Sequence, residues 1–326
     1  MKMTLFFLLF FVLATHVDGQ EDFSKADSFA GGLVYMSDDA RELSGFLTSG
    51  FKSDIQKARV IYTWVCKNIS YDINKSLNRT GIRYTYSSEE EKKQILEKII
   101  SDGVRETLKR RKGICEDYSN LFTALCRYSG LEVKTIRGSA RVNPRLTGQT
   151  RLPDDHTWNA IKINASWWIV DATWGAGSID PGRKKFIKSF REEFFMIDPS
   201  IAIFSHYPKD REEQLLPGTI GPEELAKMPV TGNGFVRYRV TGFEPSTAII
   251  KSNREGTVVI TITSGGKVPG KYLVTEDNSR KEIQPVSQAK GTLTFEISTK
   301  GRSGRLVTIS GLEEGQVYDI ITYKIQ

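Results

Sequence analysis

KGICEDY, residues 112–118, is the stretch that decides the fold of this chain. It places Cys115 between a glycine turn and the first turn of a predicted helix, which ends at Gly130, a residue type that commonly follows a last helical turn. The partial positive charge of a helix N-terminus stabilises a thiolate, and so does the basic run at residues 109–112. The sequence therefore predicts Cys115 as a nucleophile.

Two further stretches supply the partners of a cysteine nucleophile. DHTWN at 155–159 begins a predicted strand, and WIVDATW at 168–174 ends the next one. An Asn-Ala-Ser turn joins these strands, so we expect them to be adjacent and antiparallel. The carboxylate of Asp171 then fixes the imidazole of His156, whose other ring nitrogen faces Cys115, which is the arrangement used in acyl transfer.

Each of these residues also has an ordinary structural explanation when it is taken alone. The joint occurrence of all three, in order and in matching local context, is what favours a catalytic triad. The chain has three histidines, and His16 falls in the predicted leader. His206 is the remaining rival base, but it lies in a polar, proline-containing stretch where we expect no strand aspartate to orient it.

The N-terminus predicts a secretory signal over residues 1–19. Lys2 supplies the positive region, residues 5–14 are mostly large and apolar, and Val17 and Gly19 are the small residues before a cleavage site. The alternative is a membrane anchor, which needs about 20 apolar residues. The apolar run is shorter than that, and we predict no transmembrane segment further along.

Composition limits the classes of partner. The 46 lysines and arginines exceed the 39 aspartates and glutamates by seven, and they are spread along the chain. The dense run at 109–112 lacks the interleaved aromatic residues of a nucleic-acid platform, so we expect no nucleic-acid binding. The mature chain is long enough for two domains.

Three cysteines leave at least one thiol without an intramolecular partner. On one helix, Cys115 and Cys126 would lie about 16 Å apart, too far to bridge. The sequence leaves two alternatives open. Either Cys66 and Cys126 form a disulfide, or both are small buried hydrophobic residues.

Hydrophobic periodicity predicts a first domain in which helices precede strands, which indicates an α+β class. The segments 72–87 and 143–155 are polar and predict loops. The expected helices are 38–47, 53–69, 87–100 and 115–130, and the expected strands are 133–138, 157–163 and 167–171.

A glycine- and proline-rich segment at 217–234 precedes a second domain at 230–326. This region has no cysteine, tryptophan or histidine, and its many short strands suggest an immunoglobulin-like β-sandwich. We expect it to be a binding or spacing module that offers a surface to a protein partner. The expected strands are 235–241, 247–250, 257–263, 272–275, 293–297, 306–309 and 318–323.

The motifs resemble those of the transglutaminase-like superfamily, and the resemblance covers roughly residues 28–217. Its downstream part is similar to the kyphoscoliosis peptidase branch. The matching stretches are KARVIYTWV at 57–65, ISYD at 69–72, GICEDYSNLF at 113–122, HTWN at 156–159, VDATWG at 170–175, SHYP at 205–208 and QLL at 214–216.

This resemblance implies a papain-like, transglutaminase-like core domain. It implies Cys115 as nucleophile, His156 as base and Asp171 as orienter, with His206 as a structural feature of the family. The backbone N–H of Cys115 is the expected oxyanion donor, and a second donor is expected from residues 64–71. We see no acidic loops spaced for calcium and expect neither a metal nor a cofactor.

The leading hypothesis is a secreted enzyme that acts on an amide bond of a protein or peptide, with hydrolysis favoured over transamidation on the resemblance. One alternative is a catalytically degenerate scaffold or protein-binding module. Another is cleavage of an amide-linked glycan, in which tryptophans stack on sugars, although the same tryptophans also suit the core beside the triad. The tryptophans concerned are Trp158, Trp167, Trp168 and Trp174.

Overall fold

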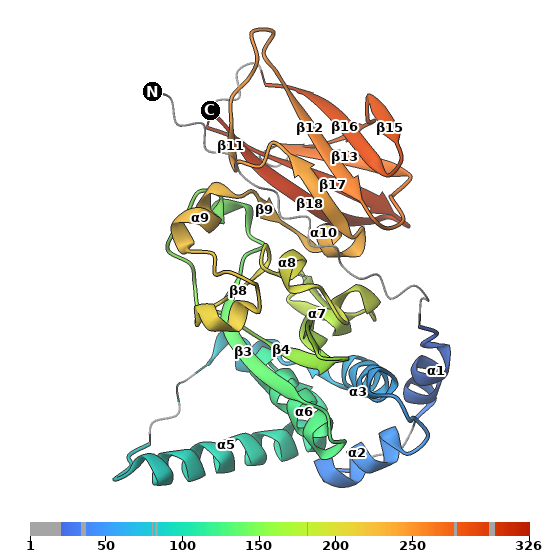
Figure 1. Cartoon of the computed structure of the whole chain (residues 1–326), viewed down its shortest axis with the longest axis vertical. Helices are drawn as coiled ribbons and strands as arrows, with labels where there is room; N and C mark the ends of the chain where they lie inside the picture. Colours follow the sequence, from blue (N-terminus) through green and yellow to red (C-terminus); the bar gives the residue numbers. More distant parts are fainter. Residues whose placement is uncertain are drawn as a thin grey trace.

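The computed structural model describes residues 21–33, 37–79, 81, 84–180, 182–276, 279–299 and 304–326. Figure 1 shows two parts stacked along the long axis of the molecule, an α+β part below and a β-rich part above. The predicted signal at 1–19 lies outside the described residues. Among the residues that are described, no helix combines the length and the hydrophobicity needed to cross a membrane.

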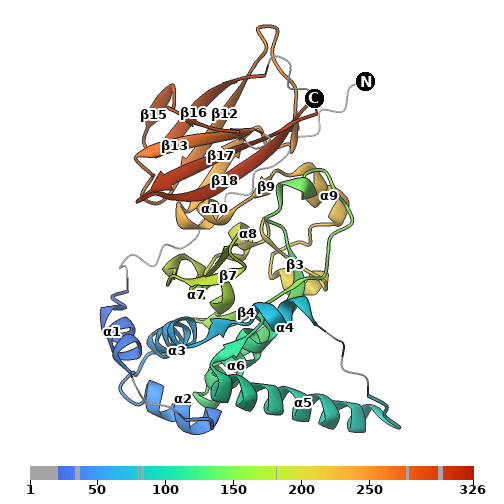
Figure 2. The same cartoon turned by 180° about the vertical axis from the view of Figure 1, so that it is seen from behind.

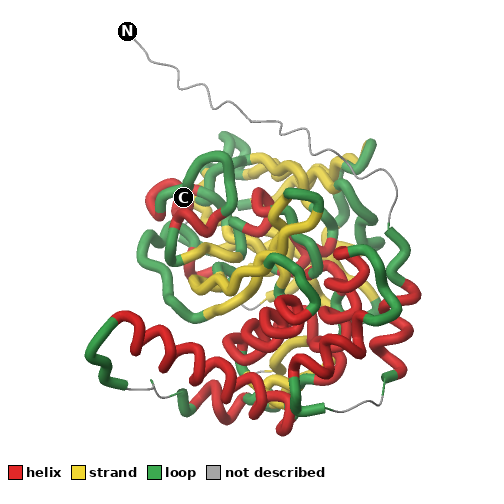
Figure 3. Tube along the Cα trace, turned by 60° about the horizontal axis from the view of Figure 1, so that its bottom comes forward, coloured by secondary structure: helices red, strands yellow, loops and turns green. Residues whose placement is uncertain are grey.

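The helices of the α+β part begin where the sequence offers capping side chains. Ser53 accepts a hydrogen bond from the N–H of Gln56, and Ser88 accepts one from Glu91. Figure 3 shows the longer helices gathered toward one end of the molecule. These helices are α1 (Ser24–Gly32), α2 (Ala40–Thr48), α3 (Asp54–Asn68), α4 (Ile73–Leu77), α5 (Glu89–Arg110), α6 (Cys115–Tyr128), α7 (Ala172–Ala176) and α8 (Pro199–Ala202), with 3₁₀ turns at Pro144–Leu146, Glu192–Phe194 and Arg211–Gln214.

Two helix predictions were wrong in extent. The helix expected to end at Ile100 continues to Arg110, because Val104, Thr107 and Leu108 bury one face of its second half at helical spacing. Gly103 suggests an earlier end in the sequence, but tertiary packing outweighs its low helix propensity. The expected loop at 72–87 contains α4, capped by Asp72. Figure 2 shows α5 extending away from the body of the molecule below α4.

A four-stranded sheet with the order β5-β4-β3-β8 is the frame on which the α+β part is built. All of its pairs are antiparallel, and Asn164 and Ala165 adopt positive φ in the tight turn between β4 and β5. Helix α6 packs against β3 and β4. The strands of this part are β1 (Ser70–Tyr71), β2 (Lys112–Gly113), β3 (Val133–Ala140), β4 (His156–Ile163), β5 (Ser166–Val170), β6 (Gly177–Asp180), β7 (Lys185–Lys188) and β8 (His206–Pro208), with β1–β2 and β6–β7 forming two small separate pairs.

Arg59 ties the N-terminal helix to the rest of the core. Its guanidinium is 2% exposed and donates two hydrogen bonds to Asp27 of α1, at 2.8 and 2.7 Å. Thr63 donates a third hydrogen bond to the same carboxylate. The ring of Phe195 lies against the guanidinium at 4.7–5.9 Å together with other aromatic rings of the core. A buried cation is stable only with such a partner.

Replacing Asp27 by alanine leaves the Arg59 guanidinium buried without its bidentate partner. Glu192 is also near Arg59, at 3.4 Å, but it is largely exposed to water and is a weak substitute. We expect Asp27→Ala to lower the free energy of unfolding by about 3 kcal/mol, measured by urea denaturation.

The matched control is Asp54→Ala, which removes an exposed carboxylate 3.6 Å from Lys57 on the same helix. Its expected effect is below about 1 kcal/mol. Equal losses of stability in the two variants would contradict the role assigned to the Asp27–Arg59 pair.

The β-rich part consists of two sheets, with strand orders β10-β12-β16-β15 and β11-β18-β17-β13-β14, and β9 joins the second sheet by pairing with β18. Side chains from both sheets form one apolar core, in which Tyr272 and Phe295 pack edge to face. The strands are β9 (Val230–Thr231), β10 (Val240–Glu244), β11 (Ile249–Ile250), β12 (Thr257–Ser264), β13 (Lys271–Glu276), β14 (Ser279–Ile283), β15 (Ser287–Ala289), β16 (Thr292–Ser298), β17 (Leu306–Glu313) and β18 (Gln316–Ile325).

The strand predictions for this part were wrong in two places. The expected strand at 235–241 begins as a helix, α10 (Asn233–Arg237), because the glycine-rich turn before it bends the chain into the core through Phe235. The edge strands β14 and β15 were not predicted, because they are exposed almost throughout and carry no apolar alternation.

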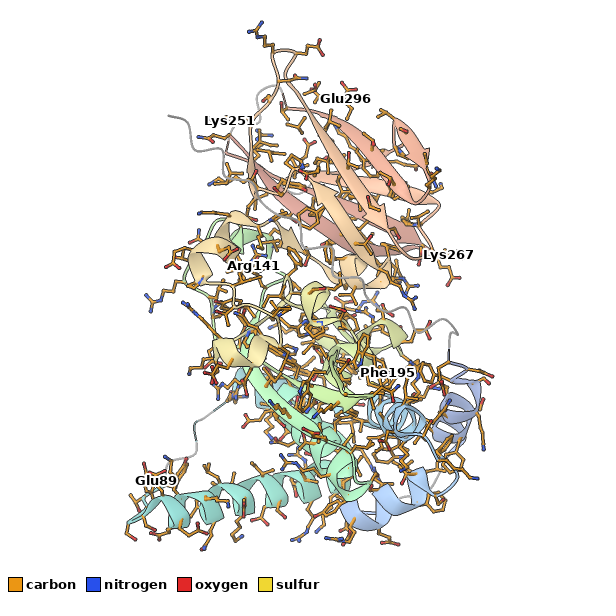
Figure 4. All side chains as sticks on the ribbon, in the orientation of Figure 1. Glu89, Arg141, Phe195, Lys251, Lys267 and Glu296 are labelled. Carbon is orange, nitrogen blue, oxygen red and sulfur yellow. The ribbon has the colours of Figure 1, made fainter. Side chains whose placement is uncertain are left out.

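Arg141 holds the junction between the two parts, where Figure 4 labels it. Its fully buried guanidinium donates hydrogen bonds to backbone carbonyls of the segment that leads into the β-rich part, including Leu225 in α9 (Pro222–Lys227), Met228 and Pro229. Burial lowers the pKa of Arg141 to about 10. The connecting segment is therefore fixed to the α+β part rather than left as a free linker.

Candidate active site

Cys115 is the first residue of α6, as the sequence predicts, and it is 4% exposed. The backbone before it is fixed by Asp117, whose carboxylate accepts a hydrogen bond from the N–H of Ile114 at 2.8 Å. Lys75 pairs with the same carboxylate at 2.6 Å. The thiol therefore sits at a rigid helix start, next to the N–H groups that the first turn leaves free.

Buried hydrogen bonds hold α6 against the histidine strand. The amide of Asn159 on β4 donates to the carbonyl of Ser119 at 3.1 Å and to the hydroxyl of Thr123 at 2.9 Å. The hydroxyl of Ser119 donates to the carbonyl of Thr157 at 2.9 Å. These contacts explain why asparagine follows the histidine at that spacing, and they fix the distance between helix and strand.

The predicted partnership of His156 and Asp171 is present. Asp171 follows the last residue of β5, and its Oδ2 lies 2.6 Å from Nε2 of His156 at the start of β4. The antiparallel register, in which Asn159 pairs with Val170, brings the two strand ends together. Cys115 and His156 line the same cavity.

The carboxylate of Asp171 is completely buried, and both of its oxygens accept two hydrogen bonds. Oδ1 accepts from the N–H groups of Thr173 at 2.8 Å and Trp174 at 2.9 Å, which caps α7. Oδ2 accepts from two histidines. Burial alone raises the pKa of a carboxyl, but the charges and hydrogen bonds of the histidines outweigh it and lower the pKa of Asp171.

The electrostatics of His156 follow from the same contact. Burial disfavours the imidazolium, but the charge of Asp171, its hydrogen bond and the adjacent Cys115 sulfur together raise the pKa of His156 to about 10. His156 is therefore set to carry a proton at neutral pH and to stabilise a thiolate on Cys115.

His206 occupies a different place from the one expected. It is buried, and its Nε2 lies 3.1 Å from Oδ2 of Asp171, so the expectation that no aspartate orients it was wrong. Residue Ala140 of β3 pairs with His206 on β8, whereas Gly138 of β3 pairs with His156 on the other side. A side chain at Gly138 would lie 2.1 Å from the carbonyl oxygen of Tyr207, so glycine permits this close approach.

The tautomer of His206 follows from its two partners. Burial lowers the pKa of His206, so the ring is neutral at physiological pH. Nδ1 lies 2.9 Å from the hydroxyl of Ser205, which donates to it, and Nε2–H then donates to Asp171. His206 supports the carboxylate that orients His156. The sequence signal was its status as the other histidine outside the leader, and strand pairing across β3 was needed to place it.

Two of the four tryptophans pack beside the triad, in agreement with the core alternative. Trp174 stacks on His156 with ring centroids 4.9 Å apart and lies 4.5 Å from the ring of His206. Trp158 lies edge-on to His206 at 5.1 Å. These rings exclude water from the carboxylate and hold both imidazoles in place.

The three thiols have distinct environments, and all three are free, so the disulfide alternative is not realised. Cys66 donates a weak hydrogen bond to the carbonyl of Ala172 at 3.4 Å, and burial raises its pKa. Burial likewise raises the pKa of Cys126. Of the three, only Cys115 lines the cavity.

The basic run before Cys115 directs its side chains to other partners. Lys109 lies 3.7 Å from Asp38, and Arg110 lies 3.5 Å from Asp72. The guanidinium of Arg111 lies over the ring of Trp64. The helix N-terminus and His156 are thus the local features that favour a thiolate.

The cavity at Cys115 has a volume of about 370 Å³, within the usual range for binding sites. Tyr71, at the end of the segment expected to supply a second oxyanion donor, is one of its walls. Its hydroxyl lies 3.2 Å from that of Ser76. The hydroxyl of Thr173 is buried in the wall, and no described residue hydrogen-bonds to it.

A metal ion is the other group that this cluster could hold. Ligand atoms of His156, Asp171 and His206 lie within 4.8 Å of one another. The two hydrogen bonds of 2.6 and 3.1 Å already account for this proximity, and an ion there would have to displace both of them.

The two histidines predict opposite pH dependences of stability. The pKa of His156 is raised in the folded state, so its stabilising contribution is complete below its unfolded pKa of about 6.5 and declines as the pH rises toward about 10. We expect the difference in unfolding free energy between wild type and His156→Gln to shrink over that interval, measured by urea denaturation at successive pH values.

His206→Gln is the matched control. The pKa of His206 is lowered in the folded state, so its contribution changes only as the pH falls below about 6.5. Superimposable pH dependences for the two variants would contradict the assigned protonation states.

Residues 41–172 match the family model described as the transglutaminase-like superfamily. The chain is similar to kyphoscoliosis peptidase of Mus musculus, with 25% identity over 292 residues, and of Homo sapiens, with 26% over 294 residues. These alignments cover 86% and 87% of this chain and 41% of each relative, so the chain spans about two fifths of their length. Among solved structures, the periplasmic domain of TgpA from Pseudomonas aeruginosa is 18% identical with a TM-score of 0.26, covering 46% of this chain and 47% of that one.

Proposed function

We propose, from the fact that residues 41–172 belong to the transglutaminase-like superfamily and most of the chain is distantly homologous to kyphoscoliosis peptidase, that this protein is a cysteine-nucleophile enzyme. Its substrate is an amide bond of a protein or peptide, and its catalytic residues are Cys115, His156 and Asp171. The observation that carries this proposal is the buried His156–Asp171 contact of 2.6 Å beside a cysteine at a helix start.

The first half of the reaction transfers the acyl group to sulfur. The Cys115 thiolate attacks the amide carbonyl, and negative charge develops on the carbonyl oxygen. The free N–H groups of the first turn of α6 are placed to stabilise that charge, with the Tyr71 hydroxyl as a second donor. His156, protonated at neutral pH, gives its proton to the leaving amine as the C–N bond breaks and a thioester forms.

The second half releases the acyl group. Neutral His156 now takes a proton from water, and the resulting hydroxide attacks the thioester carbonyl to give a carboxylic acid and regenerate the thiolate. A primary amine in place of water gives transamidation by the same steps. We favour water, on the homology to relatives named as peptidases.

The β-rich part supports a second proposal, that residues 230–326 form an immunoglobulin-like sandwich that presents a surface to a protein partner. Strands β10, β12, β16 and β15 follow the order A-B-E-D of such sandwiches, and β18, β17 and β13 follow G-F-C. Loss of partner capture on deleting an exposed loop of either sheet, with the core intact, checks this proposal.

We further propose that the chain is exported and cleaved after Gly19, because its first residues have the charge, apolar run and small residues of a signal. N-terminal sequencing of the mature protein is expected to begin at Gln20. A retained leader would contradict export by this route.

The function is tested with a defined peptide mixture, read by mass spectrometry in water and in the presence of a fluorescent primary amine. We expect new carboxyl termini from the wild type, and a loss of about 10³-fold or more in Cys115→Ala, since the nucleophile is removed.

Cys126→Ala is the control, because it removes a buried thiol that does not line the cavity. Its rate is expected to stay within a few-fold of wild type. Products that persist in Cys115→Ala would contradict the mechanism. A wild type that forms neither product would favour the degenerate scaffold.

A further inference from the structure

The cavity at Cys115 is closed on one side by the β-rich part. Gly232, Asn233 and Asp319 line it together with residues of the α+β part. Figures 1 and 2 show α10, at the near edge of the β-rich part, next to α8. We propose that Asp319 is a specificity-determining residue that binds a cationic group of the substrate, an inference that rests on the proposed function of Cys115.

A β-bulge aims Asp319 toward this cavity. In the pairing of β17 with β18, Ile309 opposes Ile321 and Ser310 opposes Asp319, so Ile320 is the extra residue. Ile320 and Ile321 are both buried, which breaks the alternation of the strand. Bulges of this kind redirect a side chain and are frequent beside functional sites.

The carboxylate of Asp319 is held in one orientation and keeps one oxygen available. Ser310 donates a hydrogen bond to Oδ1 at 2.7 Å. Among the residues that the structure describes, no lysine or arginine forms an ion pair with Asp319. Arg191 lines the same cavity but is not paired with it. A half-buried acid without a cation is suited to receive one from a ligand.

The backbone around Asp319 is fixed by the segment that enters the β-rich part. The N–H of Gly232 donates to the carbonyl of Ile320 at 3.1 Å. A Cβ at Gly232 would lie 2.4 Å from the carbonyl oxygen of Asp319, so the contact requires glycine. Arg141 holds the carbonyls just before this segment. The position of Asp319 relative to the α+β part is therefore built into the fold.

An ion-pair bridge holds the two parts together close to this wall. Arg237 of α10 lies 3.3 Å from Glu193 in the α+β part and 2.8 Å from Glu313. Its guanidinium also lies 4.4 Å from the ring centroid of Tyr318, the residue before Asp319. The bridge keeps the acid facing the cavity.

The rest of the cavity suits an alkyl chain that ends in a positive charge. Tyr71, Trp174, Phe186 and Phe194 give it aromatic walls. Such walls bind the methylene stem of a lysine or arginine, or the first residues of a peptide with a free amino terminus, while Asp319 binds the cation. These two sources share one chemistry and are separated by the experiment below.

The test uses methanethiosulfonate reagents of similar size on the full mature chain. The Cys115 thiolate attacks the reagent sulfur, a disulfide forms and methanesulfinate leaves. We compare a reagent that carries a 2-aminoethyl group with one that carries a 2-sulfonatoethyl group, and subtract the background of Cys115→Ala. The cationic-to-anionic rate ratio is expected to fall about fivefold or more in Asp319→Asn.

Glu296→Gln is the matched control, since it removes one exposed negative charge from β16, at the end of the molecule remote from the cavity in Figure 4. Its ratio is expected to stay within twofold of wild type. An unchanged ratio in Asp319→Asn would overturn the inference while leaving the proposed function intact. A Cys115 that does not react even with the neutral methyl reagent would contradict both.

The source of the cation is assigned by protecting Cys115 from iodoacetamide with three short amides. Acetyl-glycyl-lysinamide offers a side-chain cation, glycyl-norleucinamide offers an amino terminus, and acetyl-glycyl-norleucinamide is neutral. Stronger protection by either cationic amide than by the neutral one, lost in Asp319→Asn, supports the inference and identifies the source. Equal protection by all three would overturn it.

Discussion

The buried carboxylate of Asp171 is the interaction on which the site depends. Its four hydrogen bonds join the end of β5, the start of β4, the first turn of α7 and the edge strand β8. An isolated carboxylate without exposure to water is very unfavourable, so these four segments must meet for the chain to fold. The same contacts raise the pKa of His156, which ties the stability of the fold to the protonation state of the site.

Local sequence was enough to predict the elements that carry Cys115, His156 and Asp171, because a helix start, a tight turn and two alternating strands have strong local signals. The structure brings His156 and Asp171 together as expected. Local sequence was not enough for His206, whose contact with Asp171 depends on the pairing of β8 with β3 across 66 positions of chain from Ala140 to His206, a non-local choice. The length of α5 and the exposed edge strands β14 and β15 were missed for the same reason, since packing decides them.

The junction between the two parts gives the β-rich part a place in the chemistry. A flexible spacer would leave the cavity to the α+β part alone, whereas Arg141, Arg237 and the pairing of β9 with β18 hold a second wall against it. Asp319 reaches that wall through a bulge that strand periodicity in the sequence does not reveal. The cysteine chemistry and the selection of substrate thus arise from residues some 200 positions apart, Cys115 and Asp319, lining one cavity.

The measurement that tests the central claim most directly is the rate of Cys115 alkylation by iodoacetamide between pH 5 and pH 9, in wild type and in His156→Ala. The account predicts that wild-type Cys115 reacts faster at pH 6 than a free cysteine, because protonated His156 stabilises its thiolate, and that His156→Ala slows this reaction about tenfold or more. Wild-type alkylation no faster than that of free cysteine, and unaffected by the loss of His156, would contradict the account.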